Sequence, residues 1–274
     1  MTPSQALTLH ARRIDAGPLD GLVTHLVAIG GRACGRQVLL ALPSDTPMLH
    51  VHLSGDPERD RAGGQASLYT GIRRGSSPHA IEGDFLTLFA LLTPAGSLAL
   101  LHGQALAERE PCLPLQELLD TRCAASLERG VHAAYGEHAL QPLGRWLEQR
   151  LTRRLPVPAS ARRAAAAAID LGREPRLSVS DAAARQAVSA RQLERDMLRC
   201  FNVGPKHYAM AARLQAACRL ASQGLGLSAA AAEAGYADQA HLSRETRAIT
   251  GLPPAALKHA MEHDESYWMY RIWR

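Results

Sequence analysis

Arginine side chains recur at matching positions in two short stretches in the second half of the chain. These stretches are "AVSARQLERDMLR" at residues 187–199 and "GYADQAHLSRETR" at residues 235–247. A guanidinium group can donate two hydrogen bonds at once to O6 and N7 of a guanine base, or it can clamp a phosphate. The residue types therefore favour the binding of a polyanion, provided that each stretch is a helix that turns its arginines outward.

The residues that begin a helix lie at the same distance from one leucine in both stretches. Ser189 lies four residues before Leu193, and Asp238 lies four residues before Leu242. Serine and aspartate are good N-caps, because their side-chain oxygen accepts a hydrogen bond from a free backbone N–H of the first turn. Gln192, three residues after Ser189, also predicts a capping box.

The residues that end a helix repeat as well. They follow each leucine after nine and twelve residues: Asn202 and Pro205, then Gly251 and Pro254. Asn and Gly tolerate the left-handed conformation that closes a helix, and Pro is common just beyond it. Small residues, Ala183 and Ala231, precede the turns, where crossing helices leave room only for a methyl group. The pattern predicts two helix-turn-helix units whose second helices span about 190–200 and 239–249.

A single amphipathic helix is expected between the two units. The stretch "YAMAARLQAACRLA" places Leu214, Ala217 and Leu220 at helical spacing, so that they share one face. Such a helix would join the two units rigidly.

The positive charge of the chain lies in the same region. Residues 161–258 carry 14 basic and 8 acidic side chains, a net charge of +6, whereas residues 1–160 carry 15 of each. A basic excess confined to one segment is expected if that segment meets a polyanion such as DNA.

This arrangement closely resembles the DNA-binding domain of the AraC/XylS family of bacterial transcription regulators, over roughly residues 160–258. The first unit of the family is matched by "LSVSDAAARQAVSARQLERDMLRCFNVGPKHY", and the second by "AAEAGYADQAHLSRETRAITGLPPAAL". The resemblance implies a sequence-specific DNA-binding transcription regulator that inserts two recognition helices into successive major grooves of double-stranded DNA. It also implies that the chain is not an enzyme and needs no cofactor.

Some positions depart from the pattern of the family. Asn202 stands where Gly is usual, and Met197 and Thr246 stand where Phe is common. Leu257 replaces a usual Tyr, which Tyr208 retains in the first unit. We expect these changes to affect stability more than function, with Thr246 leaving a polar and smaller core residue.

At about 100° per residue, the helical positions opposite the leucines point outward and are expected to meet DNA. The outward positions and their neighbours on the two helices make up the expected DNA-binding set: Ser189, Arg191, Gln192, Glu194, Arg195, Arg199, Asp238, Gln239, Ala240, His241, Ser243, Arg244 and Arg247. Arg195 and Arg244 contact either a base or the backbone, and the sequence does not decide between these roles. Ala240 would let the backbone approach a base or touch a thymine methyl group.

Other chemistry has weaker support in the sequence. His50 and His52 form the H-x-H pair of cupin metal sites, and Asp56 and Gly63 lie at tolerable distances, but no glycine precedes them and a third ligand is ambiguous. We therefore expect no metal, and interpret the pair as a polar, outward strand face. The familiar nucleophile, nucleotide-binding and zinc-protease motifs are absent from the sequence. Five scattered cysteines without a C-x-x-C pair are expected to be reduced and buried.

The first half of the chain reads as β-rich, with strands such as "QVLLAL" and "PMLHVHL", and with "FLTLFALLTPAG" ending in a Pro/Gly turn. Helical spacing begins near "PLQELL", and "PVPAS" is the expected boundary. We expect an α+β protein with three parts: a β-rich N-terminal regulatory domain, 1–155, with trailing helices; the all-α DNA-binding domain, 160–260; and an aromatic tail, 261–274. The segments "LALPSDTPMLHVHL" and "FALLTPAG" of the N-terminal domain resemble divergent sensor regions of the family. A cupin-like sheet is one candidate arrangement of this domain.

Two functions for the N-terminal half stay open. It either senses a small-molecule effector or forms a homodimer, or it is only a protein-interaction module of a constitutive or partner-controlled DNA-binding protein. RNA polymerase is a further candidate partner. The N-terminus lacks the order of a signal peptide and no apolar run reaches the length of a membrane span, so we expect a cytoplasmic protein without a membrane partner.

Overall fold

A computed structural model of the 274-residue chain describes residues 7–14, 19–41, 44–53, 67–73, 77–104, 106, 112–134, 138–152, 156–264 and 267, with the backbone alone at 7–14, 38–41 and 77–80. The chain forms two compact units. The first comprises Met1–Gln37, Thr46–Gly71 and Ile81–Arg162, and the second comprises Val38–Asp45, Ile72–Ala80 and Arg163–Arg274. The expected domain limits, 1–155 and 160–260, stay a prediction about function.

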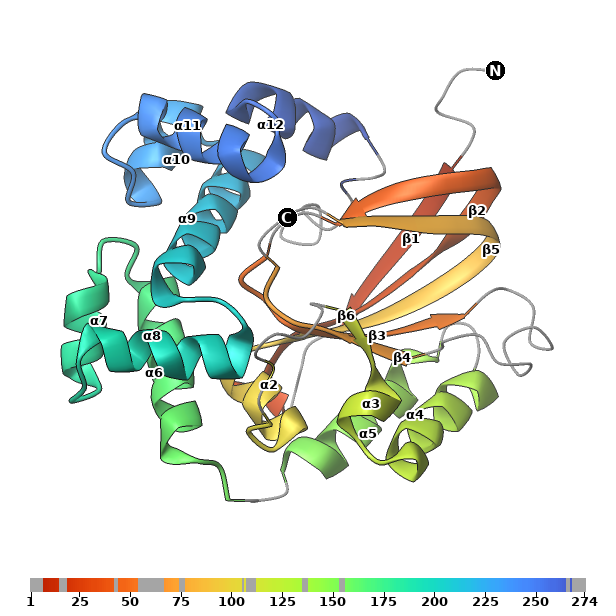
Figure 1. The fold of residues 1–274 in the computed structure, drawn as a ribbon. Helices are drawn as coiled ribbons and strands as arrows, with labels where there is room; N and C mark the ends of the chain where they lie inside the picture. Colours follow the sequence, from red (N-terminus) through yellow and green to blue (C-terminus); the bar gives the residue numbers. More distant parts are fainter. Residues whose placement is uncertain are drawn as a thin grey trace. The chain divides into compact units, whose positions relative to one another are not determined.

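The strands of the N-terminal half form one six-stranded sheet in the order β1-β2-β5-β3-β4-β6 (Figure 1). They are β1 (Leu7–Ile14), β2 (Val23–Ala41), β3 (Met48–Leu53), β4 (Ser67–Thr70), β5 (Ser77–Leu92) and β6 (Cys112–Pro114). Strand β3 pairs antiparallel with both β4 and β5, with Val51 opposite Leu88. The α+β class is confirmed, whereas closure of the sheet into a cupin-like barrel stays a prediction.

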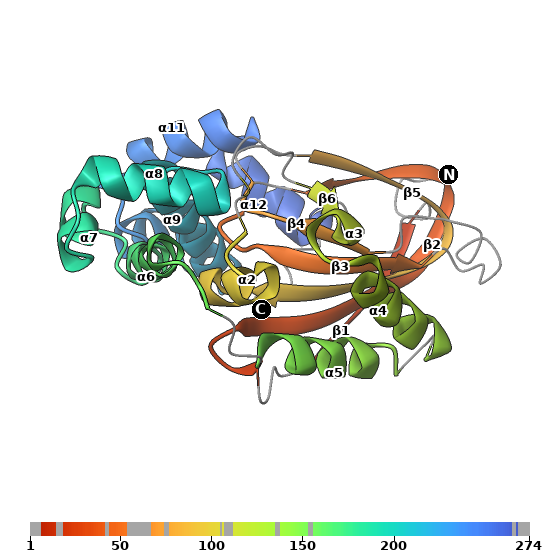
Figure 2. The same cartoon turned by 60° about the horizontal axis from the view of Figure 1, so that its bottom comes forward.

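In the described part of the first unit, four helices bury one face of this sheet. They are α2 (Pro94–Leu101), α3 (Leu115–Leu118), α4 (Thr121–Ala133) and α5 (Leu140–Leu151). Because side chains alternate along a strand, Leu49, Val51 and Leu53 share one face, where they join Leu127 and Leu143 in a single core. Figure 2 shows α4 and α5 lying along the sheet.

The expected turn after "FLTLFALL" is wrong, because the segment "TPAG" begins helix α2. The Thr93 hydroxyl oxygen accepts a hydrogen bond from the backbone N–H of Gly96 at 3.0 Å, and Pro94 occupies the first helical turn. A proline costs little there, since the N–H it lacks would have no intrahelical partner. Pro94 therefore starts a helix here and does not form a turn.

The interpretation of His50 and His52 as an outward, solvated face is also wrong. His50 is only 8% exposed, its Nε2 lies 2.9 Å from the Thr70 hydroxyl, and its ring stacks on Phe89. His52 is half-buried and pairs with the Thr87 hydroxyl at 2.8 Å. Threonine hydroxyls on neighbouring strands satisfy both imidazoles, which explains polar residues on a buried face.

The second unit contains seven helices in its described part. They are α6 (Ala159–Arg173), α7 (Val179–Arg185), α8 (Ala190–Phe201), α9 (Pro205–Ser222), α10 (Leu227–Glu233), α11 (Gln239–Thr250) and α12 (Pro254–His263). The expected linker helix is α9, with Leu214 and Ala217 buried, and Figure 1 shows α8 and α11 near its opposite ends. None of the helices in the described part of the chain has the length and hydropathy needed to cross a membrane.

The cysteines are all free thiols, as expected, but they are not all buried. Cys200 and Cys218 are buried, whereas Cys34 is exposed. Burial raises the pKa of the Cys200 thiol to about 11 and that of Cys218 to about 12. Because the thiolate is the reactive form, these two side chains act as small apolar residues.

Helix α2 lies so close to the preceding chain that Gly96 has no room for a side chain. A Cβ at this position would overlap the Leu22 carbonyl oxygen, whereas a Cβ at Gly130 in α4 would meet only Pro142, at 3.5 Å. We expect Gly96→Ala to lower the free energy of unfolding by about 3 kcal/mol. The matched change Gly130→Ala should leave it equal or raise it by up to about 1 kcal/mol. Urea titration followed by circular dichroism measures both, and equal effects would contradict the close approach.

Candidate nucleic-acid interface

Helices α8 and α11 begin at the two predicted caps. Ser189 has extended backbone, and its hydroxyl oxygen accepts from the Gln192 N–H at 3.2 Å. The Asp238 carboxylate accepts from the His241 N–H at 2.6 Å. The predicted second helices, 190–200 and 239–249, are therefore confirmed to within one residue.

Both helices end in the conformation that their sequences predict. Asn202 has φ 58° and closes α8, and Gly251 has φ 77° and closes α11. Pro205 and Pro254 then occupy the first turns of α9 and α12. Asn202 and Gly251 therefore end one helix, and each proline starts the next.

The two helix-turn-helix turns close in the same way but differ in length. In the first, Val188 N–H donates to the Ala183 carbonyl, and in the second Tyr236 N–H donates to Ala231. Ala187 and Gly235 take the left-handed conformation, at φ 54° and 83°. Four residues separate α7 from α8, and five separate α10 from α11, so the second turn contains one extra residue.

The predicted anchors point into the interior. Leu193 and Met197 of α8 are fully buried, and Leu242 and Thr246 of α11 are 2% and 1% exposed. The Thr246 hydroxyl donates to the Leu242 carbonyl oxygen at 2.7 Å, which satisfies the polar group inside the core. A small apolar cavity lined by Leu214, Leu242 and Thr246 remains beside it, in keeping with threonine filling a position that a larger side chain could occupy.

The outward positions of both helices are exposed. The exposed members of the expected set are Ser189, Arg191, Glu194, Arg195, Arg199, Asp238, Gln239, Ala240, Arg244 and Arg247, and the half-buried members are Gln192, His241 and Ser243. The Glu194 carboxylate lies over Gly204, the N-cap of α9, where the backbone N–H groups favour an anion. The structure therefore presents arginines on the outer sides of α8 and α11.

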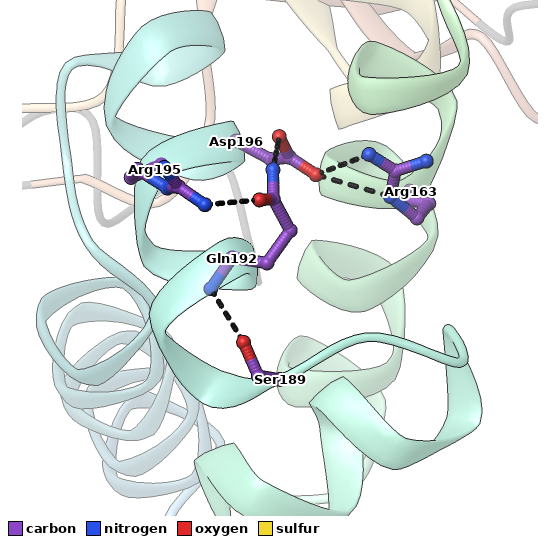
Figure 3. Close-up of polar contacts among 5 residues, drawn as sticks. All are labelled: Arg163, Ser189, Gln192, Arg195 and Asp196. Carbon is purple, nitrogen blue, oxygen red and sulfur yellow. Dashed lines mark hydrogen bonds and ion pairs between the residues drawn. The ribbon is translucent and has the colours of Figure 1, made fainter.

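An ion pair with a buried carboxylate holds α8 against α6. Asp196 is 4% exposed, and its Oδ2 accepts from Nε and Nη2 of Arg163 at 3.0 and 2.8 Å (Figure 3). Its Oδ1 accepts from the Gln192 side-chain amide at 2.8 Å, and the Gln192 amide oxygen accepts from Arg195. The expected capping box is thus half made, since the Gln192 side chain serves Asp196 and Arg195 and does not return to Ser189.

An equivalent ion pair holds α11 against α9. Glu245 lies 3.1 Å from the Arg213 guanidinium, and both side chains are about one-fifth exposed. His241 also approaches the Glu245 carboxylate, at 3.3 Å, while the Arg213 guanidinium covers the Tyr236 ring at 5.7 Å. His241, expected to face DNA, therefore lies at the edge of this group.

The sequence reasoning missed these two ion pairs, although a signal was present. Asp196 and Glu245 both lie three residues after the anchoring leucine, which places them beside the buried face of the helix. Their partners, Arg163 and Arg213, come from the helix that precedes each helix-turn-helix unit. Superposing the acidic residues as well as the arginines would have pointed to them.

Nothing in the described part of the chain brings three or more His, Cys, Asp or Glu side chains together to hold a metal ion.

The surface arginine Arg185 is paired with Glu174, with Nη2 and Oε2 2.7 Å apart, and this contact lowers the pKa of the Glu174 carboxyl. Several arginines outside α8 and α11 thus have acidic partners.

Comparison with known proteins agrees with the helix-turn-helix geometry. Residues 182–260 match a family model described as a helix-turn-helix domain. This match covers α8 to α12 with the end of α7. No curated protein matches the chain.

Among solved structures, the matches include ToxT from Vibrio cholerae. ToxT from strain O395 has 10% identity and a TM-score of 0.46, over 94% of this chain and 99% of that one. The same protein bound to (E)-4-(8-methylnaphthalen-1-yl)but-3-enoic acid has 9% identity and a TM-score of 0.48, over 93% and 99%. Apo ToxT K231A has 8% identity and a TM-score of 0.43, over 93% and 97%. At this low identity, neither the ligand of ToxT nor the role of any of its residues can be assigned to this chain.

The turn residues Ala187 and Gly235 provide a matched pair of changes. A left-handed alanine is strained, so Ala187→Gly should raise the free energy of unfolding by about 0.5–1 kcal/mol. Gly235→Ala should lower it by at least about 2 kcal/mol, because a Cβ would lie 2.7 Å from the Pro175 Cβ at φ 83°. Thermal unfolding of the full chain measures both changes, and effects of the same sign would refute this account of the turns.

The Arg163–Asp196 ion pair beneath α8 should contribute more to the stability of the fold than the exposed arginine beside it does. Arg163→Ala leaves the buried Asp196 carboxylate without its charged partner and should lower the free energy of unfolding by about 3 kcal/mol. Arg162→Ala, at the adjacent exposed position, should change it by less than about 0.5 kcal/mol. If the two variants unfold at the same urea concentration, Asp196 does not depend on Arg163.

Proposed function

We propose that this chain, whose residues 182–260 match a helix-turn-helix family model, is a sequence-specific DNA-binding transcription regulator of the AraC type that reads DNA with α8 and α11. DNA binding and transcription regulation follow from the type of the domain. The assignment of the two reading helices and their residues is our proposal. Its function is binding, without a catalytic step.

One observation carries the proposal. Two capped helices, each anchored by a buried leucine, turn arginines to the solvent at equivalent positions. The described residues contain no ion-pair partner for Arg191, Arg199, Arg244 or Arg247, in contrast to Arg163 and Arg213. Unneutralised guanidinium groups on a helix that fits the major groove are suited to guanine edges and phosphates.

The linker helix α9 sets the proposed mode of binding. Both helix-turn-helix units pack against it, so a single chain would place α8 and α11 in successive major grooves, about 34 Å apart along one face of the DNA. Such a chain would read an asymmetric site. No twofold-symmetric dimer is required.

The side chains of the recognition helices would divide into two groups. Arg195 is held by Gln192, which is itself fixed by the buried Asp196, so its guanidinium is preorganised. Arg191, in the first turn of α8, is our candidate for a base contact, and Arg199 and Arg247, in the last turns, are candidates for phosphate contacts. Ser189 and Asp238 would act mainly through their caps.

We propose residues 1–155 as a regulatory domain and 160–260 as the DNA-binding domain of a cytoplasmic protein. A small-molecule effector, a second copy of the chain and RNA polymerase are its candidate partners. The alternative is that the N-terminal half is a protein-interaction module of a constitutive or partner-controlled DNA-binding protein. A ligand that changes the DNA affinity of the purified full chain favours the first function, and a requirement for a partner protein favours the second.

The roles of the arginines can be separated by binding measurements on the full chain, with an operator first isolated by selection from random duplexes. Arg191→Ala should weaken operator binding by about 1–3 kcal/mol and relax preference at one base pair. Arg199→Ala should weaken all sequences about equally and reduce the salt slope by about 1. Fluorescence anisotropy at several salt concentrations measures both.

Arg173→Ala is the control, because this exposed arginine ends α6 outside the proposed recognition helices. It should leave affinity, preference and salt slope unchanged. A failure to select any duplex sequence, or equal effects of the three variants, would show that α8 does not read DNA.

A further inference from the structure

Two histidines lie side by side on the exposed surface of α12. His259 and His263 are one helical turn apart, and both are exposed. Their rings stack with centroids 4.2 Å apart and planes inclined by 24°. Residues four apart on a helix share one face, so this arrangement follows from the sequence spacing and the helix together.

The hydrogen bond of His263 fixes which of its nitrogens is available. Its Nδ1 lies 2.9 Å from the His259 carbonyl oxygen. A carbonyl oxygen can only accept, so Nδ1 carries the proton and donates, which leaves the lone pair of the neutral ring on Nε2. Metal-binding histidines are commonly oriented in this way, with one ring N–H donated to a backbone carbonyl and the other nitrogen on the metal.

The position of the pair on the helix also favours a cation. His263 is the last residue of α12, and Asp264 caps the helix at its C-terminal end. The free carbonyl groups of a helix C-terminus carry partial negative charge. The backbone carbonyl groups at this end therefore attract a divalent ion in addition to any side-chain ligand.

We propose that His259 and His263 chelate one divalent transition-metal ion, and bind Cu²⁺ more tightly than Ni²⁺ or Zn²⁺. Imidazole nitrogen suits these ions, and affinity for a given nitrogen site rises to Cu²⁺ and falls again at Zn²⁺. Two nitrogens at about 2.0–2.1 Å from one ion are about 3–4 Å apart, a separation that exposed side chains one helical turn apart can reach.

The proposed site differs from the pair considered in the sequence. His50 and His52 are buried and bonded to threonines, whereas His259 and His263 are exposed. Since the described residues offer no third protein ligand, water completes the coordination. The proposal departs from the expectation that the chain binds no metal, which stays a prediction for the rest of the chain.

Metal binding at this site would stabilise the second helix-turn-helix unit. Leu257 and Met261, on the buried side of α12, pack in one cluster with Leu242, the anchor of α11. An ion that bridges two turns of α12 binds the folded helix more tightly than the unfolded chain, and so raises its stability. The inference itself does not depend on DNA binding.

The test uses the full, tag-free chain titrated with CuCl₂, followed by calorimetry and by electron paramagnetic resonance. We expect the native chain to bind one ion. His259→Ala and His263→Ala should each lower the Cu²⁺ affinity at least about tenfold, because one imidazole alone then holds the ion. His138→Ala removes an exposed histidine of the first unit and should leave this ion in place. The resonance spectrum should show two coordinated imidazole nitrogens.

Three outcomes would overturn the proposal: equal Cu²⁺ affinity in native and His263→Ala chains, a spectrum with one nitrogen, or Zn²⁺ bound more tightly than Cu²⁺. Thermal unfolding provides an independent readout that does not use the spectrum. Saturating Ni²⁺ should raise the unfolding midpoint of the native chain by about 3 °C, and leave both single variants unchanged. A loss of the shift in His138→Ala alone would assign the ion to the first unit.

Discussion

A buried carboxylate that must be neutralised determines where helix α8 lies. Asp196 projects from α8 into the interior, and Arg163 of α6 and Gln192 of α8 together supply its hydrogen bonds. A buried charge without a partner costs several kcal/mol, so α8 cannot rotate or slide away from α6 without losing them. The same constraint acts on α11, where Glu245 is paired with Arg213 of α9.

The exposed arginines depend on these contacts. Because Asp196 and Leu193 face inward, Arg191, Arg195 and Arg199 are forced outward on the other side of a helix with 3.6 residues per turn. The caps then define the length of the helix that carries them. Arg195 is linked directly to the interior, since Gln192 accepts its hydrogen bond with one end of the amide and donates to Asp196 with the other. The buried Asp196 carboxylate thus orients the exposed Arg195 guanidinium through the Gln192 amide.

Local chemistry explains which expectations from the sequence are confirmed. N-caps, left-handed closing residues and alternating strands depend on a few neighbouring residues, and Ser189, Asn202 and Leu49 behave accordingly. The failures involve residues whose surroundings come from elsewhere in the chain. The pattern "TPAG" predicts a turn, whereas Thr93 caps a helix there. The strand pattern predicts a solvated His50, whereas Thr70 and Phe89 contact its ring in the interior.

By itself the sequence determined the two helix-turn-helix units, their caps and the face that carries the arginines, because helical periodicity and capping are local properties. Only the tertiary structure decided which acidic residue meets which arginine, since Arg163 and Asp196 are 33 residues apart. It also decided that the two turns differ by one residue, and that His259 and His263 stack at the end of α12. Such contacts depend on the relative placement of whole helices, and packing fixes that placement only when all of them are present.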